Sequence, residues 1–140
     1  MTLQERLVTV LDDVVALQQE DDGAVTVHHD GTVASLRVVA IAEDLELISL
    51  TQILAWDLPL DAKLRATVAD HAHNTLLGTV SLAAKSGPTQ IAAGAKGNSK
   101  KAADVLLRYN FPAAGLTDDA LRTLIMMVLA TGADVRRALV

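Results

Sequence analysis

The sequence of 140 residues predicts an α+β fold, with a mostly antiparallel sheet flanked by helices in the order α-β-β-β-α-β-β-α. Apolar residues recur at helical spacing near both ends of the chain and alternate with polar residues in several runs between them. Short polar connections separate the first three of these runs, as in an antiparallel meander. A single domain over residues 1–140 is expected, and 51% hydrophobic against 21% charged residues supplies its core.

The first helix is predicted from its start signal. Thr2 and Glu5 have the spacing of a capping box, in which each side chain accepts a hydrogen bond from a free backbone amide. Residues 21–23, Asp-Asp-Gly, are expected to end the helix. Its apolar stripe would comprise Leu3, Leu7, Val10, Leu11, Val14 and Leu17.

Three strands are expected to follow as a meander. The first covers residues 24–28 and is closed by Asp30-Gly31, a dipeptide suited to a tight hairpin because both positions tolerate positive φ. The second covers residues 33–42. The third, residues 45–55, is apolar on both faces, as expected for a central strand.

A second helix is predicted to start within residues 57–61, where Pro and two Asp residues suit a first turn, and to run to about Thr75. A strand over residues 79–84 should follow. His71 is expected on the buried face of this helix and His73 on the opposite face. Because residues two apart on a helix point in different directions, these two histidines are not predicted to bind one metal ion.

Residues 85–103 are rich in Gly and Lys and predict a flexible insert, with a brief strand considered at 89–92. Connections of this length are often functional. The segment around Lys96, Lys100 and Lys101 superficially resembles a phosphate loop but lacks the Gly-Lys-Ser/Thr step. We interpret it as a solvated loop, with anion or partner contact as the alternative.

The next strand is predicted over residues 105–111, and Pro112 stops it. The terminal helix then starts at Thr117, a good N-cap followed by two acidic residues that favour the positive end of the helix dipole. Its core stripe would comprise Leu121, Leu124, Ile125, Val128, Val135 and Leu139.

The opposite side of the terminal helix is unexpectedly apolar. Met126, Met127 and Ala130 lie there on the helical wheel, where a monomer would normally be polar. We predict that these residues form a dimer or partner interface, because Met side chains adapt readily to a partner. The alternative is that another helix or the long loop covers this face within the monomer.

Composition and charge argue against several classes of function. The net charge of −5 disfavours nucleic acid and anionic membranes as partners, and the longest apolar run, residues 124–130, is shorter than the roughly 20 residues that cross a bilayer. The absence of cysteine excludes thiol chemistry and suits the cytoplasm. No catalytic, cofactor-binding or metal-ligating residue is predicted, and no cofactor.

The charge is unevenly distributed along the chain. Residues 1–50 hold ten acidic and two basic residues, whereas residues 51–140 hold seven acidic and ten basic residues. The two parts are therefore expected either to carry ordinary surface charge or to attract each other, within one protomer or between two.

Two segments resemble the YbjN-like bacterial family and the related type III secretion chaperone-like fold. Residues 73–82, HNTLLGTVSL, resemble the family's helix end, glycine and alternating strand, and residues 116–121, LTDDAL, resemble its segment before the last helix. The resemblance implies a helix-flanked antiparallel sheet, dimerisation and binding of other proteins, and it carries no catalytic residues. The insert at 85–103 departs from the family, which has a tighter hairpin there.

These observations lead to a hypothesis about function. We expect a noncatalytic, cytoplasmic protein-interaction module, chaperone-like or regulatory, that acts as a homodimer and binds another protein. The alternative is a small-molecule or anion sensor that uses the Gly/Lys-rich loop.

Overall fold

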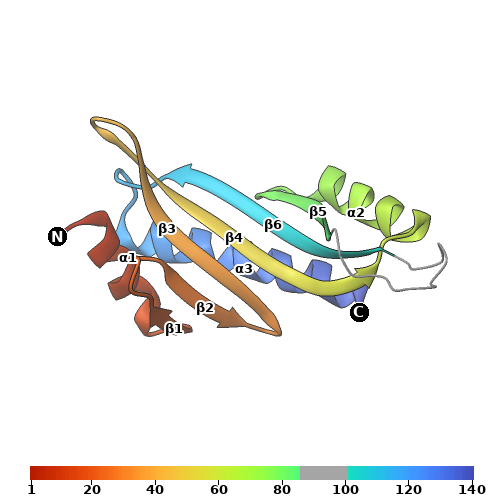
Figure 1. Ribbon diagram of the computed structural model, residues 1–140. Helices are drawn as coiled ribbons and strands as arrows, with labels where there is room; N and C mark the ends of the chain where they lie inside the picture. Colours follow the sequence, from red (N-terminus) through yellow and green to blue (C-terminus); the bar gives the residue numbers. More distant parts are fainter. Residues whose placement is uncertain (86–100) are drawn as a thin grey trace.

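The computed structural model describes residues 1–85 and 101–140 and contains a six-stranded antiparallel sheet in the order β1-β2-β3-β4-β6-β5 (Figure 1). The predicted α+β class is confirmed, with one strand more than expected. The elements are α1 Leu3–Asp12, β1 Ala16–Gln19, β2 Val25–His29, β3 Thr32–Ala42, β4 Leu45–Pro59, α2 Ala62–Asn74, β5 Thr79–Lys85, β6 Ala102–Pro112 and α3 Asp118–Leu139.

Helix α1 begins as predicted but ends earlier. The Thr2 hydroxyl accepts a hydrogen bond from the Glu5 amide at 3.1 Å, and the Glu5 carboxylate accepts one from the Thr2 amide at 3.0 Å. The helix stops at Asp12, and the additional strand β1 pairs with β2. The prediction of a helix up to Leu17 is wrong: Val14, placed on the predicted apolar stripe, lies beyond the helix and is 43% exposed, and Leu17 belongs to β1. A run of apolar residues this short fits a strand period of two as well as a helical stripe.

The ends of β4, α2 and β6 also differ from the prediction. Strand β4 continues to Pro59, which pairs with Ala102 at the start of β6, so Pro59 does not lie in the first turn of a helix. Helix α2 instead starts after Asp61, whose carboxylate accepts a hydrogen bond from the Leu64 amide at 2.8 Å. Most of the insert predicted at 85–103, including the strand considered at 89–92, lies outside the described residues.

Other local predictions are confirmed. Asp30 and Gly31 turn the β2–β3 hairpin with φ values of 46° and 82°. Thr117 caps α3 by accepting a hydrogen bond from the Ala120 amide at 3.1 Å. Strand β6 alternates as expected, with Val105 and Phe111 among its buried residues.

The three helices lie on one face of the sheet. Helix α3 runs behind β3 and β4, α1 packs beside it, and α2 meets the carboxyl end of α3 around a shared pocket (Figure 1). The core lies between this helical layer and the sheet. Its largest fully buried apolar side chains are Leu7, Leu11, Leu36, Ile48, Leu50, Leu54, Leu107, Leu121, Ile125 and Leu129.

A buried glutamine joins α3 to the middle of the sheet. Gln52 of β4 is fully buried, and its amide nitrogen donates hydrogen bonds to the Thr32 hydroxyl at 2.9 Å and to the Leu129 carbonyl at 3.2 Å. Gly132 makes this approach possible, because a Cβ atom there would lie only 2.0 Å from the Gln52 side-chain oxygen. The position of α3 over the sheet therefore depends on a glycine within the helix.

Three arginines attach α3 to its neighbours by donating to backbone carbonyls. Arg6 of α1 donates to the Leu116 carbonyl at 2.6 Å, just before α3 begins. Arg122 of α3 donates to the Val10 carbonyl of α1 at 3.0 Å. Arg136 donates to the Leu54 carbonyl of β4 at 2.7 Å. The helix is thus held along most of its length.

We expect Gly132→Ala to lower the free energy of unfolding by about 1–3 kcal/mol, the usual cost of overpacking, although Ala is the better helix former by about 1 kcal/mol. Urea unfolding followed by circular dichroism measures this. Gly115→Ala is the matched control, because a Cβ atom there has no neighbour within 4 Å. A Gly132→Ala protein as stable as the wild type would show that the close approach of Gln52 to α3 does not require a glycine at position 132.

Candidate interaction surface

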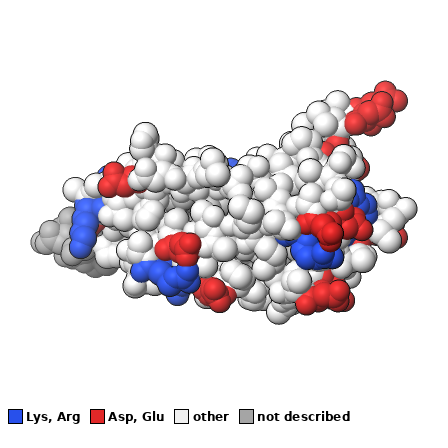
Figure 2. Space-filling view, turned by 180° about the vertical axis from the view of Figure 1, so that it is seen from behind, with Lys and Arg blue, Asp and Glu red and all other residues white. Residues whose placement is uncertain are grey.

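The middle of α3 presents an uncharged surface. Residues 123–133 contain no Asp, Glu, Lys or Arg. Met127 is 50% exposed, and Ala130 is exposed one turn later. Figure 2, seen from the helical side, shows a broad uncharged area in the middle of the molecule, with charged groups gathered towards its two ends.

The three residues predicted to form the interface differ in exposure. Met127 and Ala130 are exposed, so they are not covered by another helix of the same chain. Met126 is half-buried and packs against the core. Met126 lies on the flank of α3 that also carries Arg122, whose side chain reaches α1. We therefore define the α3 surface by Met127 and Ala130.

The polar groups around the α3 surface have partners within the chain. The Thr131 hydroxyl donates to the Met127 carbonyl at 2.9 Å, so it needs no partner from outside. Arg122 pairs with Asp119 at one end of the surface, and Arg137 pairs with Asp134 at the other. Because these charges are balanced locally, contact with an apolar partner leaves few polar groups unsatisfied.

The predicted lysine loop is described only at its end. Lys96 and Lys100 lie outside the described residues. Lys101 is exposed, and its backbone carbonyl accepts a hydrogen bond from the Leu60 amide at 2.9 Å. Its backbone thus helps to position the start of α2, and an anion site on this loop stays a prediction.

The histidines have positions that agree with a structural role. His71 is half-buried and His73 exposed, and the His71 carbonyl accepts a hydrogen bond from the Thr75 hydroxyl at 2.5 Å. His28 is exposed on the sheet. Among residues 1–85 and 101–140, no three His, Asp or Glu side chains form a group suited to a metal ion.

A charged cluster stabilises an irregular point of the sheet. Asp57 in β4 has a φ of 55°, and its amide donates to the Asp104 carboxylate at 3.0 Å. The Lys85 ammonium lies 2.5 Å from the Asp57 carboxylate and 3.2 Å from that of Asp104. Hydrogen bonds to Asp57 and then Asp104 raise the pKa of Lys85. The cluster therefore joins β4, β5 and β6 where the β4 register shifts.

The β3–β4 hairpin forms a second exposed surface, which sequence reasoning missed. Residues 39–46 are all exposed, and we call this segment the arm. Val39, Ile41 and Leu45 are 40%, 56% and 43% exposed. An apolar run predicts a strand whether or not other elements cover that strand. The sequence pattern therefore could not show that residues 39–46 are exposed.

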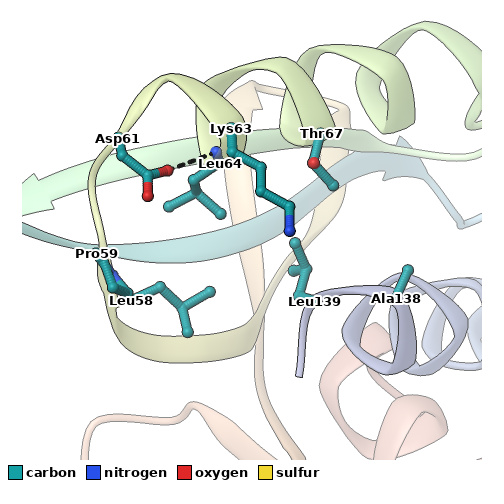
Figure 3. Close-up of a pocket in the computed structure, with 8 residues that line it drawn as sticks. All are labelled: Leu58, Pro59, Asp61, Lys63, Leu64, Thr67, Ala138 and Leu139. Carbon is teal, nitrogen blue, oxygen red and sulfur yellow. Dashed lines mark hydrogen bonds between the residues drawn. The ribbon is translucent and has the colours of Figure 1, made fainter.

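A shallow pocket of about 220 Å³ lies where α2 meets the end of α3 (Figure 3). Its walls combine apolar side chains with the polar groups of Asp61, Lys63 and Thr67, and Lys63 extends across it towards Leu139. The lining residues are Leu58, Pro59, Asp61, Lys63, Leu64, Thr67, Ala138 and Leu139.

These features define an α+β domain with one helical layer, an exposed apolar helix surface and a projecting arm. The fold is similar to that of YbjN from E. coli, known from a crystal structure, with a TM-score of 0.62 and 11% sequence identity. The match covers 94% of this chain and 87% of the other. The YbjN-like resemblance inferred from the two segments is thus confirmed for the fold.

Sequence comparisons add no closer relation. No protein-family model matches the chain, and no curated protein matches it in sequence. In the described part of the chain, no helix has the length and apolar character needed to cross a membrane.

One pH-dependent property can be predicted from the Asp22–Arg37 pair. Hydrogen bonds from the Arg37 guanidinium at 2.7 Å and the Ala24 amide at 3.1 Å lower the pKa of the Asp22 carboxyl. Because the Asp22 pKa is lower in the folded than in the unfolded chain, the pair stabilises the folded state at pH values above the unfolded-state pKa. This stabilisation is lost as the pH falls through the folded-state pKa of Asp22. We expect Arg37→Ala to raise the Asp22 pKa, measured by NMR titration of the carboxyl carbon.

Arg65→Ala serves as the control, because Arg65 is exposed on α2 and forms no ion pair within the described residues. An Asp22 titration that is the same in wild type and Arg37→Ala would contradict the pairing.

Proposed function

We propose that this chain is a noncatalytic protein-interaction module, chaperone-like or regulatory, that acts in the cytoplasm as a homodimer and binds another protein. The observation that carries the proposal is the uncharged, exposed α3 surface around Met127 and Ala130. Met127 is the one large exposed apolar side chain of α3, and contiguous apolar surface around such a residue marks contact between protein chains.

The energetics require more than the two methionines considered from the sequence. Burying one Met side chain contributes roughly 1.5–3 kcal/mol, whereas a micromolar complex needs about 8 kcal/mol after the costs of association. A two-fold symmetric contact counts each residue twice, because the same surface is used by both copies. Met127 and Ala130 would then form the centre of a larger interface.

The regulatory or chaperone-like role is supported by the fold. YbjN, which has a similar fold, is a proposed transcription regulator. The resemblance of residues 73–82 and 116–121 to the YbjN-like and secretion chaperone-like groups points to protein binding. The absence of cysteine suits a reducing compartment such as the cytoplasm.

The alternative function, an anion or small-molecule sensor, would use Lys96, Lys100 and Lys101. Lys96 and Lys100 lie outside the described part of the chain. The described geometry therefore supports the α3 surface and not this alternative.

Light scattering on the purified protein tests the proposal. We expect a dimer for the wild type and a monomer for Met127→Glu/Ala130→Glu, because the interface would have to bury four added carboxylates in the dimer. Met126 is left unchanged, since it packs against the core and its replacement would also destabilise the fold.

Leu76→Glu is the matched control, because Leu76 is 89% exposed, lies outside α3 and should leave the dimer unchanged. A monomeric wild type would contradict the proposed homodimer. A double variant that dimerises like the wild type would instead show that the α3 surface is not the interface.

A further inference from the structure

The arm, residues 39–46, pairs only with itself within the sheet. Strand β3 leaves β2 after the pair Val25–Leu36, and β4 meets β6 only from the pair Leu47–Pro112 onwards. Figure 1 shows the hairpin projecting beyond the rest of the molecule at the end where α3 begins. Its two strands therefore have free outer edges and no core beneath them.

The arm combines apolar sides with an acidic tip. Val39, Ile41 and Leu45 are exposed, and the acidic side chains of Glu43, Asp44 and Glu46 are exposed beside them. These carboxylates form no ion pair within residues 1–85 and 101–140. An isolated two-stranded hairpin is at best marginally stable in water, so the arm is suited to a partner that covers it.

The pocket between α2 and α3 offers the arm apolar contacts and one cation. Leu58, Leu64 and Leu139 provide apolar walls, and the exposed ammonium of Lys63 lies over them (Figure 3). The Asp61 carboxylate also lines the pocket, where it accepts a hydrogen bond from the Leu64 amide. Lys63 forms no ion pair among the described residues. A volume of about 220 Å³ is several times the roughly 30 Å³ that one water molecule occupies, so the pocket has room for a branched aliphatic side chain.

The arm and the pocket are the two ends of the same strand. Strand β4 starts in the arm at Leu45 and ends at the pocket with Leu58 and Pro59. Helix α3 runs from the arm end to the pocket end of the molecule (Figure 1). When two copies lie antiparallel, the arm of each therefore points to the pocket end of the other, with their α3 helices between.

We propose that the arm of one copy inserts an apolar side chain, Ile41 or a neighbour, into the α2–α3 pocket of a second copy. The carboxylates of Glu43 and Asp44 would then pair with Lys63 of that copy. The exchange is reciprocal: in a dimer with two-fold symmetry, each arm occupies the pocket of the other copy. No pocket then stays free to bind a third copy, so the assembly is closed at the dimer. This inference rests on the homodimer proposed above and adds the contacts that select a second copy as partner.

The charges of the two surfaces favour this exchange. The arm carries three carboxylates, Glu43, Asp44 and Glu46, and no base, whereas the pocket lining carries Lys63 beside Asp61, whose carboxylate already accepts a hydrogen bond from the Leu64 amide. Antiparallel copies bring these unlike parts together twice. The attraction speeds association and disfavours the parallel arrangement, in which like charges would meet.

Charge reversal tests the exchange. We expect the dissociation constant of the dimer to rise at least about tenfold in each of two variants, Lys63→Glu and Glu43→Lys/Asp44→Lys. In each variant alone, both arm–pocket contacts of the dimer become repulsive, and a tenfold change corresponds to about 1.4 kcal/mol. An equimolar mixture of the two variants should recover the wild-type dimer, because both contacts of the mixed dimer are again between unlike charges. Sedimentation equilibrium measures all three, and Arg65→Glu, on α2 but outside the pocket lining, is the matched control.

Cross-linking provides a second measurement that does not depend on charge. The chain has no cysteine, so Ile41→Cys combined with Thr67→Cys introduces the only two thiols. We expect oxidation to yield a covalent dimer through Cys pairs between copies, and much less of it for Ile41→Cys combined with Leu76→Cys.

The outcomes separate the two proposals. A wild-type dimer whose stability is unchanged by the reversals, or a mixture that associates no better than the single variants, would overturn the exchange and leave the homodimer standing. A monomeric wild type would overturn both. Arm reversals that abolish binding of a basic protein partner without affecting the dimer would also overturn the exchange.

Discussion

The close approach of Gln52 and Gly132 determines how the helical layer lies on the sheet. The side-chain nitrogen of the buried Gln52 donates to the Thr32 hydroxyl and to the Leu129 carbonyl, whereas its side-chain oxygen lies against Gly132 and has no hydrogen-bond partner among the described residues. Both partners are reached only because Gly132 has no side chain in the way. One contact thus sets the distance between α3 and β4 and also the rotation of α3 about its own axis.

That rotation explains why one helix has both a core face and an exposed apolar surface. With Gly132 directed at the sheet, Ile125 and Val128 are buried, and Met127 and Ala130 point away from it. Arg122 and Arg136 maintain this orientation through backbone carbonyls of α1 and β4. The surface proposed for dimerisation is therefore a consequence of the same packing that stabilises the monomer.

The features that the sequence predicted well are local. The capping box at Thr2, the hairpin at Asp30 and the N-cap at Thr117 each depend on a few neighbouring residues, and each appears in the structure. Strand β1 was missed because its short apolar pattern fits a helix equally well, and pairing with β2 decides between the two.

Features that depend on contacts between residues far apart in the sequence are harder to predict. The helical wheel placed Met126 with Met127, but the packing of α1 beside α3 leaves Met126 half-buried. The pocket joins α2 to the end of α3, and the arm is exposed because β2 and β6 stop short of it. Neither follows from periodicity, because both depend on where other elements end.

The arm also bears on how this protein avoids aggregation. Residues 38–42, Val-Val-Ala-Ile-Ala, combine high β propensity with no charge, which is the composition that seeds cross-β assembly when left uncovered. Arg37 precedes this run and Glu43 and Asp44 follow it, so charged gatekeepers flank it on both sides. These flanking charges are therefore expected to disfavour stacking of the run into fibrils.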